Sequence, residues 1–484
     1  MLFNSYIFIL LFLPLCVLGY FGLNHFKKYN LAQIFLLGMS LWFYGYYYPS
    51  YLLILISSVL INYSIYLLQG KLEKQGAKKA AMIAGVCINA GILLYFKYMD
   101  FFIGNINGIF KADIDFLRIA MPLGISFFTF QQISFIVDAY RGEIPKYNFW
   151  HYACFVTYFP QLIAGPIVTH DELVPQFNDV EKKKLNSENL AKGIYIFSLG
   201  LAKKVLIADM FGKLVSYGYD TADSLNSISA MIVMLSYTIQ IYFDFSGYCD
   251  MAVGLGKMMN IDLPQNFNSP YKALTITEFW DRWHMTLTRF FTKYVYIPMG
   301  GSRKGKIRTY VNVLVVFLIS GFWHGASWNF VFWGVIHGVF NVLTRIFKKF
   351  VAKVPAVINW LITFSFVNVA WVFFRAETFP KALAVLKAAF SFNFSGYDST
   401  FTTLIESSEL VELMDILKVR NLFPPVILVG YFVVAFGLII GGKNAYEKMQ
   451  TFRPTFFKFL TTMFLLIWSI FSFAGISTFL YFNF

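Results

Sequence analysis

Apolar runs long enough to cross a lipid bilayer recur along the whole chain. A helix needs roughly 17–25 apolar residues to span the hydrocarbon, and it satisfies its own backbone hydrogen bonds there. The runs lie near residues 5–24, 31–48, 51–69, 80–97, 118–138, 148–165, 190–208, 227–245, 308–323, 326–346, 354–374, 421–441 and 456–477. The pattern predicts an all-α polytopic membrane protein with about a dozen helices, some of them re-entrant or interfacial.

The composition agrees with a membrane protein. Of the 484 residues, 58% are hydrophobic and only 14% are charged, which is too little polar surface for a water-soluble chain of this size. The net charge of +14 lies in short basic clusters between the apolar runs, and topology explains this placement better than nucleic-acid binding. We therefore expect contact with membrane lipids and none with nucleic acid. Without repeats or a long soluble segment, residues 1–484 are expected to form one transmembrane domain.

The first apolar run, near residues 6–21, differs from a secretory signal. It lacks a basic n-region and a cleavage site of small residues. We expect it to be the first membrane helix.

The basic loops predict the orientation. The clusters at 27–28 and 71–79 alternate with an uncharged turn, which places the N-terminus outside. Strict alternation would then put the clusters at 182–184 and 303–306 outside, against the positive-inside rule. Both return to the cytosol if segment 148–165, which contains Pro160, fails to cross. We expect this segment to be the one that does not cross.

His324 is the strongest candidate for chemistry. It lies in the aromatic sequence Gly-Phe-Trp-His-Gly-Ala-Ser-Trp, where almost nothing hydrates a charge. Ionisable residues in such surroundings face a cavity or the interior of a bundle, and they are functional by default. The alternative is a packing histidine bonded to a carbonyl. A neutral imidazole could take a proton from a hydroxyl, which acyl transfer from a thioester requires.

A second histidine, His284, lies in an amphipathic segment at 275–297. The capping-box spacing from Thr275 to Glu278 and the later Pro298 predict one interfacial helix over this range. On such a helix the charged residues share a face, and His284 points away from them toward the protein interior. A surface-anchoring helix with one satisfied core histidine is the alternative.

The remaining polar candidates are weaker. His337 follows His324 by thirteen residues and would lie on a different face of a continuous helix. The other histidines, His25, His151 and His170, lie near predicted membrane boundaries, where an interfacial position suffices. Asp244 closes an apolar run and is expected to be paired or to face a cavity, with Ser246 beside it.

Two polar stretches have open interpretations. The loop from Gly300 to Lys306 could meet the phosphates of coenzyme A, although positive-inside topology explains it equally well. The region 391–420 is among the most polar and is expected to be a loop or a small surface helix.

Motifs of several other enzyme classes are missing from the sequence. It contains no Walker-type phosphate loop, no Gly-x-Ser-x-Gly elbow and no His-x-x-x-His pair. The scattered cysteines have no paired spacing, which predicts neither a disulfide framework nor a metal site. They are Cys16, Cys87, Cys154 and Cys249.

Several motifs, in a fixed order, give the chain a family resemblance. They include Tyr-Phe-Pro-Gln-Leu-Ile-Ala-Gly-Pro at 158–166, Phe-Asp-Phe-Ser-Gly-Tyr at 243–248, Phe-Trp-Asp-Arg-Trp-His at 279–284 and Gly-Phe-Trp-His-Gly at 321–325. With these motifs the chain resembles the bacterial membrane-bound O-acyltransferases, in particular those that O-acetylate alginate and peptidoglycan.

The resemblance implies roles for individual residues. His324 would be the catalytic histidine and His284 a second active-site histidine, in a helical fold around a central tunnel. Tyr481, in the aromatic C-terminal sequence, would carry the acyl group as a phenolic ester, with an interfacial aromatic anchor as the alternative. Further candidates to line the tunnel or bind substrate are Trp323, Trp280, Arg282, Asp244 and Ser246.

We therefore expect a multi-pass inner-membrane O-acetyltransferase that uses acetyl-CoA as donor and needs no metal. The acceptor would be an extracytoplasmic polysaccharide, peptidoglycan or alginate-like, reached with a periplasmic O-acetyltransferase or esterase-like partner. The alternative from another class is a transporter or flippase whose histidines relay protons. A transporter should show inverted halves with broken helices in matching positions, and no such pairing is visible.

Overall fold

Every regular element in the part of the chain that the structure describes is a helix. The computed structural model describes residues 1–405, 412, 416, 424–473 and 479–480. The first half contains η1 (Phe8–Phe12), α1 (Leu13–His25), α2 (Tyr29–Gly45), α3 (Ser50–Lys71), α4 (Gln75–Phe110), α5 (Ile125–Arg141), α6 (Phe149–Thr157), α7 (Phe159–Leu162), α8 (His170–Asn178), η2 (Glu181–Lys183), α9 (Ser187–Ala202), η3 (Lys203–Ala208), α10 (Asp209–Asp220) and η4 (Ala222–Ser224).

The second half begins with the 32-residue helix α11 (Ser227–Met258). After it come η5 (Pro270–Lys272), α12 (Ile276–Arg282), α13 (Met285–Phe291), η6 (Thr292–Tyr296), α14 (Lys306–His324), α15 (Trp328–Ile346), α16 (Lys348–Val351), α17 (Ala356–Arg375), α18 (Phe379–Ala389), α19 (Thr400–Ile405), α21 (Pro424–Phe436), η7 (Gly437–Gly441), α22 (Ala445–Gln450) and α23 (Phe456–Phe471).

Six helices among the described residues are long and apolar enough to cross a membrane. They are Phe8–His25, Ser50–Lys71, Gln75–Phe110, Ser227–Met258, Lys306–His324 and Ala356–Arg375. Large apolar side chains on their outer faces are exposed, such as Leu18 on α1 and Leu53 on α3, which suits lipid and not water. The expected all-α, multi-pass membrane architecture is confirmed.

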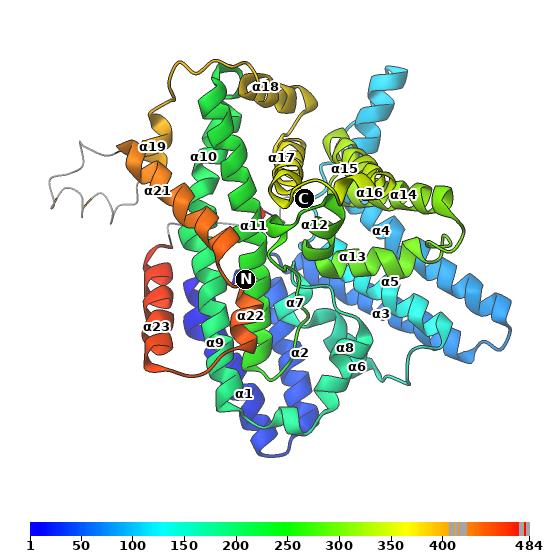
Figure 1. Cartoon of the computed structure of the whole chain (residues 1–484). Helices are drawn as coiled ribbons and strands as arrows, with labels where there is room; N and C mark the ends of the chain where they lie inside the picture. Colours follow the sequence, from blue (N-terminus) through cyan, green and yellow to red (C-terminus); the bar gives the residue numbers. More distant parts are fainter. Residues whose placement is uncertain (406–411, 413–415, 417–423, 474–478, 481–484) are drawn as a thin grey trace.

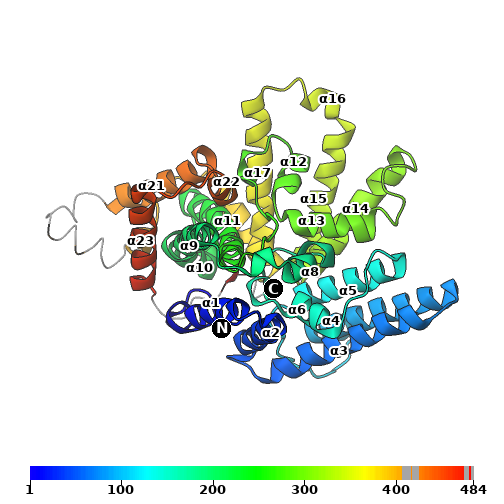
Figure 2. The same cartoon turned by 90° about the horizontal axis from the view of Figure 1, so that it is seen from below.

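A pair of long helices forms the middle of the molecule. α9, the π-helical turn η3 and α10 follow one another without interruption, and α11 runs antiparallel along them (Figure 1). Figure 2, seen from below, shows this group nearly end-on, with α1 and α2 on one side and α17 and α15 on the other.

Glycines allow these two helices to touch backbone to backbone. A Cβ added at Gly200 would lie 2.5 Å from the carbonyl oxygen of Gly247, and one added at Gly193 would lie 2.6 Å from that of Gly254. The reverse additions clash as well, at 2.8 and 2.7 Å. Small residues at such contacts are how membrane helices pack closely without a hydrophobic driving force.

Buried ion pairs link the same helices at the π-helical turn. Lys204 Nζ lies 2.6 Å from Asp244 Oδ1, and both side chains are 2% exposed. The neighbouring Lys203 pairs with Asp250 at 2.6 Å. The expectation that Asp244 is paired is thus confirmed. Its expected position at the end of a span is wrong, because α11 continues to Met258.

The basic loops gather at one end of the molecule. The Lys183 ammonium lies 4.4 Å from the centre of the Tyr29 ring, and Lys182 pairs with Asp262 at 2.7 Å. Tyr66 donates a hydrogen bond to the carbonyl of Pro145. Gln265, three residues after Asp262, lines a cavity with Asp281, and Asp281 lines a second cavity with Lys306. We call the region from Lys182 to these cavities the basic end.

Segment 148–165 does not form a spanning helix. It is divided into α6, of nine residues, and α7, of four, with a break at Tyr158. Nine helical residues rise about 14 Å, less than half of a bilayer core. The expectation that this segment does not form a membrane-spanning helix is confirmed.

The prediction of one continuous helix over 275–297 is wrong, because the segment is divided into α12, α13 and η6. The chain breaks at Trp283 and His284, and His284 adopts a left-handed conformation with φ of 46°. Charged residues expected on one face therefore pair with different elements: Arg289 with Glu172 of α8, and Lys293 with Asp138 of α5. These long-range partners and the hydrogen bonds around His284 outweigh the preference for one helix.

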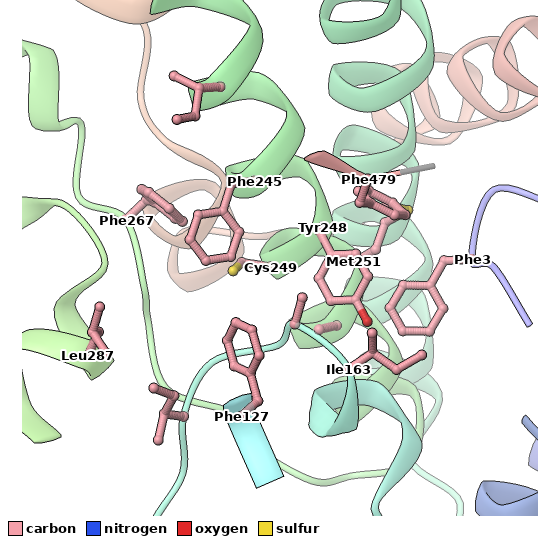
Figure 3. Close-up of a cluster of buried hydrophobic side chains, with 14 of the residues drawn as sticks. Phe3, Phe127, Ile163, Phe245, Tyr248, Cys249, Met251, Phe267, Leu287 and Phe479 are labelled. Atoms are coloured by element: carbon pink, nitrogen blue, oxygen red, sulfur yellow. The ribbon is translucent and has the colours of Figure 1, made fainter. Parts of the chain in front are cut away.

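Both described ends of the chain lie inside the protein. The Met1 ammonium donates to the Phe43 carbonyl at 2.7 Å. Figure 3 shows Tyr248 of α11 against Phe3 and Phe479, with ring centroids 4.9 and 4.6 Å away. The next residue, Leu480, donates its backbone N–H to Asp244 Oδ2 at 2.9 Å. Of the polar region 391–420, residues 400–405 form the short helix α19, and most of 406–420 lies outside the described residues.

Candidate active site

His324 is the last residue of α14 and is 3% exposed. Its ring lies 4.8 Å from that of Trp323, 5.1 Å from that of Trp333 and 5.1 Å from that of Phe374, measured between centroids. α14 and α15 meet closely here, since a Cβ added at Gly321 would lie 2.4 Å from a carbonyl oxygen of α15. The sequence prediction of an imidazole in an apolar, aromatic interior is confirmed.

His284 is completely buried at the break between α12 and α13. Its Nδ1 lies 3.1 Å from Asn266 Oδ1. That oxygen also accepts hydrogen bonds from the backbone N–H and the hydroxyl of Thr286, at 3.2 and 2.9 Å. The loop before α12 therefore holds the histidine, and the left-handed turn aims its ring inward as expected.

The Trp323 indole contacts both histidines. Its ring centroid is 6.4 Å from that of His284 and 4.8 Å from that of His324. Phe127 of α5 and Phe245 of α11 complete the apolar walls around His284, with ring centroids 6.5 and 4.8 Å from that of the histidine. Figure 3 shows these two phenylalanines near each other. Residues 40 positions apart in the sequence thus share one cluster of packed aromatic rings, which we call the aromatic chamber.

His337 belongs to the same aromatic cluster, which the sequence analysis did not expect. Its ring lies 4.7 Å from that of Trp333, the ring that also contacts His324. The chain turns between α14 and α15, so the angle expected for one continuous helix does not apply. Trp280 Nε1 donates to His337 Nδ1 at 3.2 Å, which leaves the proton of the neutral ring on Nε2.

Three cavities open around α12 and α13 at the basic end, and Asp281 lines all of them. Their volumes are about 320, 640 and 400 Å³. Trp280 lines the first, while Arg345 lines the first and the second. Partial burial raises the pKa of the Asp281 carboxyl, and the Arg345 charge opposes this incompletely. Neither His284 nor His324 lines these three cavities, so a tunnel that reaches the rings stays a prediction.

The other predicted site residues have varied positions. Arg282 pairs with Glu278 at 2.8 Å and does not line the three cavities. Ser246 is buried 3.5 Å from Lys203 Nζ, away from the imidazoles on the α9 side of α11. His170 is 3% exposed and lies against Asp138, near the end of α5. Tyr481 lies outside the described residues.

Some residues that contact the site carried no usable signal in the sequence. Asn266 lies in an irregular loop, and nothing local connects it with His284. Lys97 and Tyr98 of α4 donate hydrogen bonds to the end of α14. In the sequence they lie at the end of the predicted span 80–97, where a position at the membrane interface would explain them. A lysine directly after an apolar run is a weak signal, because snorkelling explains it equally well.

The fold and the site define a multi-pass membrane protein with imidazoles enclosed by aromatic rings in its interior. The family model described as MBOAT, membrane-bound O-acyltransferase family, matches residues 136–378. This segment includes His284, His324 and His337. The chain belongs to the membrane-bound O-acyltransferase family and is an acyltransferase. That membership decides against the transporter alternative.

Individual relatives extend over more of the chain. The peptidoglycan O-acetyltransferase of Helicobacter pylori is 41% identical, covering 100% of this chain and 98% of that protein. The "probable alginate O-acetylase" of Pseudomonas aeruginosa is 38% identical over 81% of this chain and 75% of its own length. The teichoic acid D-alanyltransferase of Lacticaseibacillus rhamnosus is 29% identical over 48% of this chain and 60% of its own length.

Proposed function

We propose that the protein transfers acetyl groups from cytosolic acetyl-CoA across the inner membrane to an extracytoplasmic polysaccharide. Peptidoglycan is the favoured polymer, because similarity to the peptidoglycan O-acetyltransferase extends over the whole chain. An alginate-like polymer is the second candidate, supported by the shorter match to alginate O-acetylases. The observation that carries the proposal is the shared aromatic chamber of His284 and His324.

In the proposed reaction His324 is the general base. Its imidazole takes the proton of an acceptor hydroxyl while the oxygen attacks the thioester carbonyl carbon. The new C–O bond forms an ester, the C–S bond breaks, and the coenzyme A thiolate leaves with the proton from the imidazolium. The aromatic walls exclude water, which would otherwise compete as acceptor.

His284 is proposed to act on the thioester rather than on the hydroxyl. The acceptor-only oxygen of Asn266 faces its Nδ1, so this nitrogen carries the proton and Nε2 is the unprotonated nitrogen of the neutral ring. The Trp323 ring against both imidazoles holds them in one chamber. His284 therefore positions the donor close to the base.

The donor is proposed to reach the chamber from the basic end. The 640 Å³ cavity is lined by Lys306, Arg345 and Lys348, and the 400 Å³ cavity by Arg289 and Lys293. Basic side chains at a cavity mouth suit the phosphates of coenzyme A. Lys and Arg also collect on the cytoplasmic side of membrane proteins, which is where acetyl-CoA would be met.

The acetyl group is proposed to leave at the opposite end. Leu480 donates its backbone N–H to Asp244 inside the bundle. Tyr481 would take the acetyl group as a phenolic ester and pass it to a periplasmic O-acetyltransferase or esterase-like partner. The partner would complete transfer to the polysaccharide.

The proposal is tested with membranes that contain the wild type or His324→Ala, supplied with acetyl-labelled coenzyme A. We expect the variant to insert normally and to lose acetyl transfer by a factor of about 10² or more, since a general base contributes roughly this much. Mass spectrometry of the cell-envelope polysaccharides should show the matching loss of O-acetyl esters.

His151→Ala is the matched control, because this histidine is a partly buried residue of α6 near the basic end. It should retain activity. Tyr481→Phe, assayed in parallel, should lose label on the polysaccharide. Full transfer by His324→Ala would refute the proposed role of that residue, and no use of acetyl-CoA by the wild type would refute the donor.

A further inference from the structure

α14 ends inside the protein, and its last carbonyl groups need partners from elsewhere. The last four carbonyls of a helix have no partner within the helix, and leaving them bare in an apolar interior is costly. A glycine follows His324, but it does not make the usual left-handed cap, because its φ is −169°. The chain passes through Gly325 in an extended form and enters α15 at Trp328.

Side chains of α4 satisfy the last three of these carbonyls. Lys97 Nζ donates to the carbonyls of Trp323 and His324, at 2.6 and 3.1 Å. The Tyr98 hydroxyl lies 2.5 Å from the Phe322 carbonyl and 3.3 Å from that of Trp323, and its ring stacks on Phe322 at 4.4 Å.

The same face of α4 also holds the start of α15. Asn105, two helical turns beyond Lys97, accepts a hydrogen bond from Trp328 Nε1 at 2.9 Å. Phe101, between them on that face, contacts the Trp328 ring at 5.7 Å. We call Lys97, Tyr98 and Asn105 the α4 clamp; it holds both sides of the turn that carries His324.

We infer that Lys97 and Tyr98 are positioning residues for acyl transfer, which set the place of the His324 ring through its backbone. This inference rests on the proposed role of His324. Lys97 bonds the carbonyl of His324 itself, so a shift of the lysine moves the base directly. Its ammonium also lies 5.7 Å from the centre of the Trp323 ring, the ring that contacts both imidazoles. α4 lies outside the segment 136–378 that matches the family model.

Substitutions in the α4 clamp should lower kcat more than they lower the affinity for the donor. Displacing a catalytic group by about 1 Å costs up to 10²-fold in rate. The cavities proposed for the donor are lined by residues 264–351, none of them in α4, so its affinity should stay unchanged. A ground-state contact would instead raise KM.

The test is a series at Lys97, assayed in membranes for kcat and for KM toward acetyl-CoA. Lys97→Met removes both hydrogen bonds and should lower kcat about 30-fold, with KM changed less than about twofold. Lys97→Arg keeps the charge and the hydrogen-bond donors and should stay within about fivefold of the wild-type kcat.

Tyr98→Phe keeps the stacking on Phe322 and should lower kcat about tenfold. Lys79→Met, on the exposed surface of the same helix, is the matched control and should match the wild type.

The His324→Ala background separates this inference from the proposed function. If the lysine acts through His324, adding Lys97→Met to His324→Ala should cause no further loss. A wild-type kcat in Lys97→Met, beside an inactive His324→Ala, would overturn the inference alone. An active His324→Ala would overturn both. A loss of activity that follows a lowered unfolding temperature, or that Lys97→Arg does not rescue, would show a structural role only. If Lys97→Met fails to accumulate, Tyr98→Phe and Lys97→Gln decide by the same criteria.

Discussion

Which nitrogen of His284 carries the proton is decided by a neighbouring amide. The backbone N–H of Thr286 can only donate, so the Asn266 atom that faces it is the oxygen. The same oxygen faces His284 Nδ1, and an oxygen that only accepts requires a proton on that nitrogen. Removal of this amide should therefore change the chemistry of His284 without touching its ring.

Asn266→Ala should lower acetyl transfer about 10- to 100-fold, because the His284 ring loses its orientation and tautomer. It should also destabilise the protein by about 1–3 kcal/mol, since the buried donors of Thr286 lose their acceptor. Transfer assays and thermal unfolding in detergent measure the two effects. Asn359→Ala is the control, because the Asn359 amide also makes two hydrogen bonds, here by donating to the carbonyls of Val351 and Val354 near the start of α17. Unchanged transfer by Asn266→Ala would contradict the assigned role.

Helices α9 and α11 can approach each other closely only because glycines lie at their contact. The contacts of Gly193 with Gly254 and of Gly200 with Gly247 repeat after seven residues on each helix, so one face of each helix lies on the other. This packing brings the π-helical turn against α11, where Lys204 meets Asp244. A methyl group at any of the four glycines must push backbone away from backbone.

Gly200→Ala should lower the stability of the protein by about 1–3 kcal/mol, because the two atoms nearest to the added Cβ belong to the backbone of α11 and cannot move aside easily. Gly22→Ala on α1 is the control: its Cβ would meet nothing within 4 Å, and alanine is the better helix former. Thermal unfolding of the detergent-solubilised variants distinguishes them. Equal unfolding temperatures for both variants would show that the close contact does not limit stability.

In the whole molecule, successive membrane-crossing helices run in opposite directions, so basic loops and weakly charged loops lie at opposite ends. Lys184 lies two residues after Lys182 of the basic end, and Lys304 lies two residues before Lys306, which lines a cavity there. Residue 111 follows the far end of the 36-residue helix α4, and residue 395 precedes Gly396, whose carbonyl accepts from Asn226 at the start of α11. Figure 1 shows the loops near α8 and near α18 at opposite extremes of the molecule. The positive-inside rule then assigns the basic end to the cytosol.

Single cysteines test this orientation in a background where the four natural cysteines are replaced by serine. A membrane-impermeant maleimide should label Lys111→Cys and Ser395→Cys in intact spheroplasts, since both positions are exposed at the end assigned to the outside. Lys184→Cys and Lys304→Cys should react only after the membrane is opened. The reverse labelling would invert the proposed path of the acetyl group.

Hydropathy and local polarity predicted a large part of this protein. The spans near 308–323, 326–346 and 354–374 agree with α14, α15 and α17 within about two residues, because a lipid-facing helix must be apolar along its own length. The burial of His324 and His284 also followed from their immediate neighbours in the sequence. The lack of a membrane-spanning helix in segment 148–165 followed from the placement of charge.

The tertiary structure alone decided which distant residues meet. Lys97 reaches a carbonyl 227 residues away, and Asn266 shapes the turn at His284 that the capping pattern assigned to one continuous helix. His337 joins His324 on Trp333 because the chain reverses after α14. Membrane insertion depends on the apolar character of each segment by itself. Contacts across the bundle depend on helix crossings and backbone breaks, which are set by packing against partners that no local pattern identifies.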